Sequence, residues 1–256
     1  MNQQPSFLSL PDRKLAYQQR RANCPQEARP SVVFLGGFAS DMTGTKATFI
    51  ANQCEARGYS YLLFDYRGHG LSSGRLEEGC IGDWLDDSLK VFDALTTGPQ
   101  LVVGSSMGGW IGLLLAKERR ERVAGFVGLA AAPDFTEDMI RPVMTPEQEQ
   151  ALETQGFFYE NTTPAAARTP ITRCLMEDGK DHCVFAEPFP INGPVRLIQG
   201  QRDLDVPWKT SLKLMDHIQQ DDMRLTLIKD ADHRLSREQD LSLIWGEIES
   251  LLLCSE

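Results

Sequence analysis

Transmembrane-length apolar runs are absent from this sequence, and its first residues show neither a basic start nor an apolar stretch. A membrane span needs about 20 apolar residues in a row, and the core of a secretory leader needs roughly seven to fifteen. We therefore expect no stable membrane anchor and a cytoplasmic location.

Cysteine and histidine are also scarce. The 256 residues include six cysteines and four histidines. The cysteines show neither CxxC spacing nor a paired histidine motif, which argues against a zinc site or a redox pair. We expect free thiols and no metal at the six positions, which are Cys24, Cys54, Cys80, Cys174, Cys183 and Cys254.

Basic residues are outnumbered by acidic ones. Lysine and arginine total 26 against 36 aspartates and glutamates, so the formal net charge is −10. Nucleic acid and anionic membranes carry charge of the same sign, and we expect neither as a partner. The charge identifies no substrate and no oligomeric state, whereas the length suits one large core.

What the sequence does contain is an alternation of short apolar runs and amphipathic segments. The run 31–37 (SVVFLGG) is β-branched and apolar and ends in glycine, as a buried strand does. Further strands are expected at 59–66, 100–105 and 123–132, and helices at 46–57, 81–95 and 107–119. This order predicts a parallel sheet with right-handed crossovers.

Between residues 133 and 190 the alternation breaks. Prolines interrupt short, mostly polar segments such as 145–155, so we expect a cap inserted into one domain that spans residues 1–256. After the cap the alternation resumes, with strands expected at 195–200 and 225–229 and helices at 208–219 and 236–253.

The strongest local signal is Gly104-Ser105-Ser106-Met107-Gly108, a G-x-S-x-G pattern between an expected strand and an expected helix. Such a serine stands on a strained turn, and the glycines avoid collisions with neighbouring backbone. The helix that begins at Met107 also directs free amides and a positive dipole end toward Ser106. A glycine- and serine-rich turn without chemistry would match as well, but the position between strand and helix favours a nucleophile.

A serine nucleophile needs a base, and the base needs a carboxylate to orient it. Asp203 follows the strand 195–200 by way of a glycine and reaches the carboxyl edge of the sheet. Asp205 competes for this role, although it can instead cap the next helix. The chain order Ser, Asp, His selects His233, which follows the last expected strand, while His69 is the other candidate base.

A tetrahedral intermediate also needs amide donors for its oxyanion. Gly36, Gly37 and Phe38 directly follow the first long strand, so the Phe38 amide can supply one donor. The amide of Met107, after the serine, can supply the second. Strands often end in glycine, so this prediction depends on the position of the pair rather than on the pair itself.

Together these motifs resemble the α/β-hydrolase superfamily from about residue 30 to the C-terminus. The loop Asp65-Tyr66-Arg67-Gly68-His69-Gly70-Leu71-Ser72 is typical of that superfamily. The resemblance implies an α/β fold with a mostly parallel central sheet, flanking helices and a helical cap. It also implies a catalytic triad of Ser106, Asp203 and His233 that needs no cofactor.

Further segments are similar to palmitoyl-protein thioesterases of that superfamily that also act as acyl-glucuronide esterases. They are Gly44-Thr45-Lys46-Ala47, Gly98-Pro99-Gln100, residues 102–110, Val206-Pro207-Trp208 and Asp232-His233-Arg234. The similarity implies hydrolysis of an acyl ester or acyl thioester, carried by a small molecule or an acylated protein, through an acyl-enzyme. No mitochondrial transit segment is evident, so a mitochondrial location is not carried over.

Cap aromatics are candidates for the wall that binds the acyl chain, although a cap also needs a core of its own. These residues are Phe157, Phe158 and Tyr159. Trp110 and Trp208 are interpreted as packing residues. The same triad also suits acyl transfer or carbon–carbon bond hydrolysis, and the alternative from another class is a non-catalytic ligand-binding protein. A dehalogenase would need a carboxylate in place of the serine.

Overall fold

A mostly parallel sheet forms the centre of the computed structural model, which describes residues 4–22, 29–159 and 169–253. Its strands are β1 (Ser6–Ser9), β2 (Lys14–Arg20), β3 (Ser31–Leu35), β4 (Tyr61–Phe64), β5 (Gln100–Ser105), β6 (Val123–Leu129), β10 (Val195–Gly200) and β12 (Met223–Ile228). They pair in the order β1-β2-β4-β3-β5-β6-β10-β12. The pairs from β4 to β12 are parallel, whereas the β1–β2 and β2–β4 pairs are antiparallel. The predicted fold class is confirmed.

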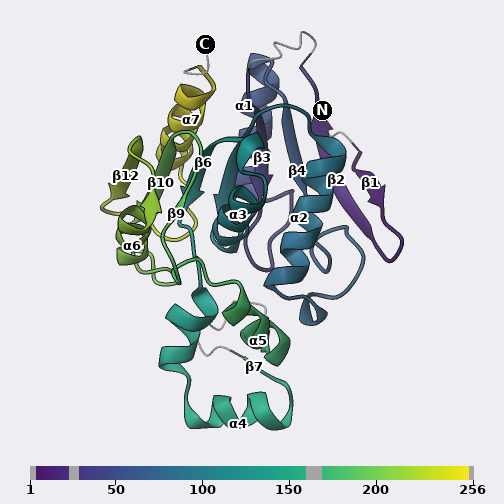
Figure 1. Cartoon of the computed structure of the whole chain (residues 1–256), viewed down its shortest axis with the longest axis vertical. Coiled ribbons are helices and arrows are strands. Elements are labelled where there is room, and N and C mark those ends of the chain that lie inside the picture. The colour runs from purple at the N-terminus through teal and green to yellow at the C-terminus, as the bar shows by residue number, and fades with distance from the viewer. Residues whose placement is uncertain (1–3, 23–28, 160–168, 254–256) are drawn as a thin grey trace.

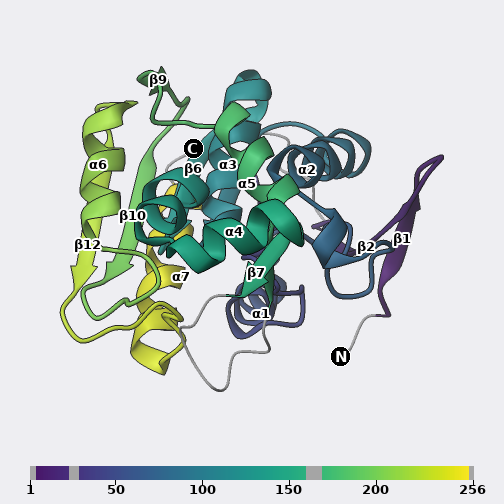
Figure 2. The same ribbon diagram turned by 90° about the horizontal axis from the view of Figure 1, so that it is seen from below.

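Helices cover both faces of this sheet, as Figures 1 and 2 show. One face carries α2 (Ile81–Leu95), α3 (Met107–Glu118) and α6 (Lys209–His217), and the other carries α1 (Thr45–Arg57) and α7 (Glu238–Leu253). In β3, Val33 and Leu35 belong to one core and Val32 and Phe34 to the other, because successive side chains point to opposite faces. This double burial explains why the central strands read as continuous apolar runs.

The N-terminal hairpin of β1 and β2 was not predicted. Only Leu15 and Ala16 of β2 are buried, and the rest of the strand is polar and partly exposed. A strand near the edge of a sheet lacks the apolar run that marks a central strand, so its sequence gives little signal.

Between β6 and β10 the chain forms a separate layer beyond one end of the sheet (Figure 1). Its elements are η3 (Thr136–Ile140), η4 (Arg141–Val143), α4 (Pro146–Thr154), β7 (Phe157–Tyr159), β8 (Pro170–Thr172), α5 (Arg173–Asp181) and β9 (Phe189–Pro190). A last short strand, β11 (Ile218–Gln219), pairs with β9. The layer coincides with the stretch where the alternation breaks, and one domain with a cap at 133–190 stays a prediction.

The two ends of the cap segment are joined by Asp134. Its carboxylate accepts hydrogen bonds from the backbone N–H groups of Val184 (2.8 Å) and Phe185 (2.9 Å). Burial raises the pKa of this carboxyl, and the two backbone donors only partly offset that effect. The cap also contacts α3, because the indole Nε1 of Trp110 donates to the carbonyl of His182 (2.9 Å). Trp110 is fully buried, as expected for a packing residue.

Four of the six cysteines are free thiols, and the other two lie outside the described residues. The free thiols are Cys54, Cys80, Cys174 and Cys183, and the remaining pair is Cys24 and Cys254. Within residues 4–22, 29–159 and 169–253, no helix combines the length and apolar character that crossing a membrane requires.

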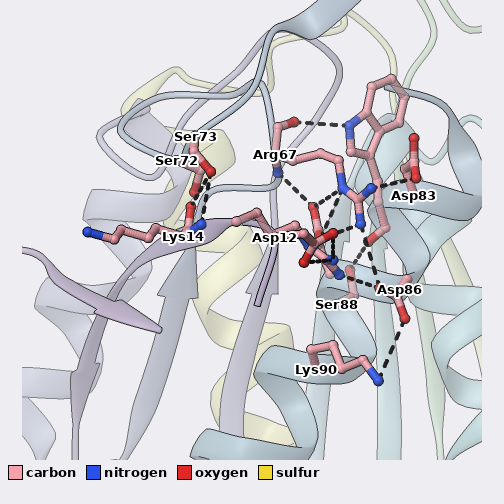
Figure 3. Close-up of polar contacts among 12 residues, drawn as sticks. Asp12, Lys14, Arg67, Ser72, Ser73, Asp83, Asp86, Ser88 and Lys90 are labelled. Carbon is pink, nitrogen blue, oxygen red and sulfur yellow. Dashed lines mark hydrogen bonds and ion pairs between the residues drawn. The ribbon is translucent and has the colours of Figure 1, made fainter. Parts of the chain in front are cut away.

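A buried carboxylate ties the N-terminal hairpin and the 65–72 loop to α2. The Asp87 side chain is fully buried and accepts from Arg13 Nε (2.6 Å), from the backbone N–H of Arg67 (2.7 Å) and from the Arg67 guanidinium (2.9 Å). Figure 3 shows the same guanidinium reaching Asp83 and Asp86. The network therefore fixes the loop that follows β4.

Replacing Asp87 by alanine should destabilise the fold by about 1.5–3 kcal/mol, because the Arg67 N–H loses its buried acceptor while both guanidiniums keep contacts with Asp86. Urea unfolding measures this change. The control is Asp93→Ala, which removes a carboxylate 44% exposed and paired with Arg119 at the surface, and should cost about 1 kcal/mol or less. Equal losses in the two variants would contradict the structural role of Asp87.

Candidate active site

The turn between β5 and α3 holds Ser106 in a strained conformation, with φ 55° and ψ −122°. Three backbone hydrogen bonds fix it there. The Ser106 N–H donates to the carbonyl of Leu129 (3.0 Å), and its own carbonyl accepts from Gly109 (2.8 Å) and Ala132 (3.0 Å). A side-chain-bearing residue keeps a positive φ only when its surroundings hold it, as these contacts do.

The glycines on either side of this turn permit close packing. A Cβ atom on Gly104 would lie 2.3 Å from the carbonyl oxygen of Gly108, and one on Gly108 would lie 2.2 Å from that of Leu35. Neither distance is compatible with a side chain. The G-x-S-x-G pattern therefore has a direct cause in the approach of α3 to the strands.

Ser106, His233 and Asp203 form a continuous chain of contacts. The Ser106 hydroxyl lies 3.1 Å from His233 Nε2, and His233 Nδ1 lies 2.8 Å from Asp203 Oδ2. The three residues follow β5, β12 and β10, at the carboxyl edge of the sheet. Because β10 and β12 are neighbouring parallel strands, the carboxylate and the imidazole leave the sheet side by side.

Asp203 is fully enclosed and accepts hydrogen bonds at both oxygens. Oδ1 accepts from the backbone N–H groups of Asp205 (2.9 Å) and Val206 (2.8 Å), and Oδ2 accepts from Gln199 Nε2 (2.8 Å) and from His233. Burial alone would raise the pKa of Asp203, but the hydrogen bond and charge of His233, with the other donors, lower it overall. Asp203 therefore stays charged and orients the imidazole.

Asp205, the competing candidate, contributes a backbone N–H, and the contact with His233 Nδ1 is made by Asp203. These three residues are also the group in the described chain whose ligand atoms lie close enough to hold a metal. The four donors on Asp203 already use its acceptor sites, so a metal would have to displace them. The arrangement suits orientation of a histidine rather than metal binding.

A cavity of about 380 Å³ lies beside Ser106 and His233, and Gly37 and Phe38 form part of its wall. A Cβ atom on Gly37 would lie 3.2 Å from the Ser106 Cβ, so the oxyanion loop (residues 36–40) passes directly over the serine. Among the described residues, neither the Phe38 N–H nor the Met107 N–H donates to another group. Both amides are available to a bound oxyanion.

His69 supports the oxyanion loop and does not contact Ser106. Its Nδ1 lies 3.1 Å from the Arg67 carbonyl, and its Nε2 accepts from the backbone N–H of Ala39 (3.3 Å), a residue with φ 55°. The ring packs edge-on against Trp84. Burial lowers the pKa of His69, which keeps Nε2 free to accept a hydrogen bond. The 65–72 motif therefore positions the loop, a role that sequence reasoning missed.

Asp65 makes a second tie from the same motif. Its carboxylate accepts from the backbone N–H groups of Met42 (2.7 Å) and Leu71 (2.9 Å). Met42 follows the oxyanion loop by two residues, so the C-terminal end of that loop is fixed at two points to the turn after β4. The sequence signal for holding the oxyanion loop is the 65–72 motif. The contacts that it makes become visible only in the folded structure.

The cap aromatics lie in β7 and are not part of the cavity wall. Phe158 is buried in the core, while Tyr159 is 42% exposed. Phe38 of the oxyanion loop instead packs near Trp84 and Phe135, with ring centroids 5.8 Å and 6.3 Å away. An acyl-chain wall formed by Phe157, Phe158 and Tyr159 stays a prediction.

Comparisons with known proteins also identify hydrolases. The family model for serine aminopeptidase, S33, matches residues 26–177. The mitochondrial palmitoyl-protein thioesterase ABHD10 of Bos taurus is 35% identical over 96% of this chain and 79% of its own length, and the Homo sapiens protein is 33% identical over the same shares.

Two solved structures are similar over nearly the whole chain. A putative hydrolase from Agrobacterium vitis S4 has a TM-score of 0.91 and 38% identity, covering 97% of this chain and 98% of its own. Mouse alpha/beta hydrolase domain-containing protein 10 has a TM-score of 0.89 and 31% identity, covering 99% and 100%. The resemblance noted from the motifs is confirmed.

The expectation of a cytoplasmic location is wrong, because the bovine and human relatives that span 96% of the chain are mitochondrial proteins. That expectation rested on the polar first residues of the sequence. A targeting signal is a segment separate from the folded domain. The hydrolase fold that the chain shares with these relatives therefore gives no information on location.

Because burial holds His69 neutral, the fold should lose stability as the pH falls below about 6.5, the ordinary histidine pKa. Below that pH the unfolded chain binds a proton at His69 more readily than the folded protein does. Protonation therefore stabilises the unfolded state relative to the folded one. His69→Phe removes this contribution. Urea unfolding at pH 5 and pH 7 should show a smaller acid loss in the variant than in wild type. An identical pH dependence would show that His69 is not held neutral.

Proposed function

The chain belongs to the serine aminopeptidase S33 family of α/β-hydrolases, and we propose that Ser106, His233 and Asp203 carry its chemistry. In keeping with relatives named palmitoyl-protein thioesterase, it is a hydrolase of acyl esters or acyl thioesters. The observation that supports the triad is the chain of contacts from the Ser106 hydroxyl through the imidazole to an enclosed carboxylate.

In the first half of the reaction, His233 Nε2 takes the proton of Ser106 as the serine oxygen attacks the acyl carbonyl carbon. The carbonyl oxygen becomes an oxyanion, to which the amides of Phe38 and Met107 donate. The intermediate then collapses, and the carbon–sulfur or carbon–oxygen bond breaks. The thiol or alcohol leaves with the proton from His233, and the acyl group stays on Ser106.

In the second half, water attacks the acyl-enzyme while His233 takes one of its protons. The second tetrahedral intermediate uses the same amides. Its collapse releases the carboxylic acid and returns the proton to the Ser106 oxygen. Asp203 stays ionised throughout, because its four donors stabilise the charged form and its role is to orient and stabilise the imidazolium.

A long-chain acyl thioester is the substrate that we propose. The names of the mammalian relatives support it, and so does the apolar contact of Phe38 with Phe135 beside the serine. A series of thioesters and oxyesters of graded acyl length, with an acyl glucuronide among them, ranks the substrates. Preference for short esters alone would contradict the long-chain proposal.

Ser106→Ala should lower the turnover of a p-nitrophenyl ester by roughly a thousandfold or more, since only binding and oxyanion-hole effects remain. Steady-state kinetics on purified protein measures the change. Turnover retained in this variant would rule out Ser106 as the nucleophile.

An activated serine should also react with a fluorophosphonate probe, and mass spectrometry should find the label on Ser106. Ser105→Ala is the matched control: it removes the adjacent hydroxyl and should still be labelled. Folded wild-type protein without label would favour a ligand-binding protein with this fold. Transfer of the acyl group to an added alcohol in preference to water would favour an acyltransferase.

A further inference from the structure

Lys46 lies in the first turn of α1, on the wall of the cavity that contains Ser106 and His233. Its Nζ donates a hydrogen bond to the backbone carbonyl of Arg234, the residue directly after His233. Lys46 and Arg234 are 188 positions apart in the chain. The bond therefore joins the helix that follows the oxyanion loop to the loop that carries the histidine.

The histidine loop (residues 230–236) has other ties: the Arg237 guanidinium binds the Asp230 carboxylate (2.6 Å), and His233 contacts Asp203. The Arg234 N–H donates to the Asp232 carboxylate (3.0 Å), and the Ser236 hydroxyl donates to the Arg234 carbonyl (2.9 Å). The Arg202 N–H donates to the carbonyl of Ala231 (2.9 Å). In the described part of the chain, Lys46 is the residue of α1 that hydrogen-bonds to this loop.

The Lys46 side chain is partly buried. Among the described residues its one hydrogen bond is to a carbonyl and it forms no salt bridge, although the charges of Asp232, Asp203 and Arg234 act on it. Burial lowers the pKa of Lys46 to about 8; Asp232 and Asp203 counteract the shift, and Arg234 adds to it. Two further titratable groups, Asp41 and His233, share its cavity wall. Because the unfolded chain would hold this proton more tightly, the lysine lowers the stability of the fold at neutral pH.

We infer that Lys46 is a positioning residue whose ammonium holds the histidine loop so that His233 stays in contact with Ser106. The inference rests on the proposed function. A hydrogen bond from a charged donor is roughly twice as strong as one from a neutral donor, so the hold weakens when the ammonium loses its proton. Lys46 lowers the stability of the fold but holds the loop of His233 from the other side of the cavity. This combination is typical of a residue retained for function.

The test compares wild type with Lys46→Met and Lys46→Arg, and with the control Lys209→Met. Lys209 is likewise at the start of a helix, α6, but its side chain is exposed. For each protein, kcat and KM for p-nitrophenyl butyrate are measured from pH 6 to 10, and the melting temperature is recorded. Fluorophosphonate labelling of Ser106 in wild type and the inactivity of Ser106→Ala establish that the measured reaction is the proposed one.

We expect Lys46→Met to lower kcat at least about tenfold, because small displacements of a catalytic group have large effects on rate. Its KM should change less than about threefold, and its melting temperature should equal or exceed that of wild type, since a partly buried charge is removed. Wild-type kcat should fall as the pH rises through about 8. Lys46→Arg keeps the charge and should retain activity to higher pH. Lys209→Met should match wild type.

The inference would be overturned if Lys46→Met had the same kcat as wild type and the same fall of kcat above about pH 8. A lower melting temperature, with equal loss of activity in Lys46→Met and Lys46→Arg, would also overturn it, because the residue would then be structural. Absence of Ser106-dependent hydrolysis in wild type would reject the proposed function, and the inference with it. Hydrolysis that depends on Ser106 but not on Lys46 would reject the inference alone.

Discussion

The site depends on the backbone of Ser106, which has a positive φ although the residue carries a side chain. Leu129 and Ala132, from β6 and the residues just beyond it, bind this backbone on one side, and Gly109 binds it from within α3. The neighbouring strand therefore sets the direction of the serine hydroxyl. The strain stays local because the sheet around it is buried on both faces and resists adjustment.

Near this fixed serine, two buried titratable groups keep different charge states. Asp203 is buried but receives four donors, so it remains an anion. His69 is buried with one donor toward its ring, so it remains neutral and can accept from the oxyanion loop. The number and kind of hydrogen-bond partners, and not burial alone, determine whether each group is charged or neutral.

Sequence reasoning succeeded where local pattern determines structure. Segments 81–95, 100–105 and 195–200 have their predicted bounds, because an amphipathic or doubly buried run is visible within a few residues. The structure also brings together Ser106, Asp203 and His233, the residues that the motif and chain order selected and that we propose as the triad. The edge hairpin and the contact from His69 to Ala39 were missed, since one lacks an apolar run and the other joins distant loops.

The cap segment leaves from β6 and returns to β10, and these two strands pair directly with each other. Asp134 closes the same junction through Val184 and Phe185. Strand pairing in the sheet is therefore continuous across the point where the insertion leaves and returns. Because the insertion leaves and re-enters between directly paired strands, changes in its length or sequence can accumulate without altering the register of the sheet that carries the serine turn.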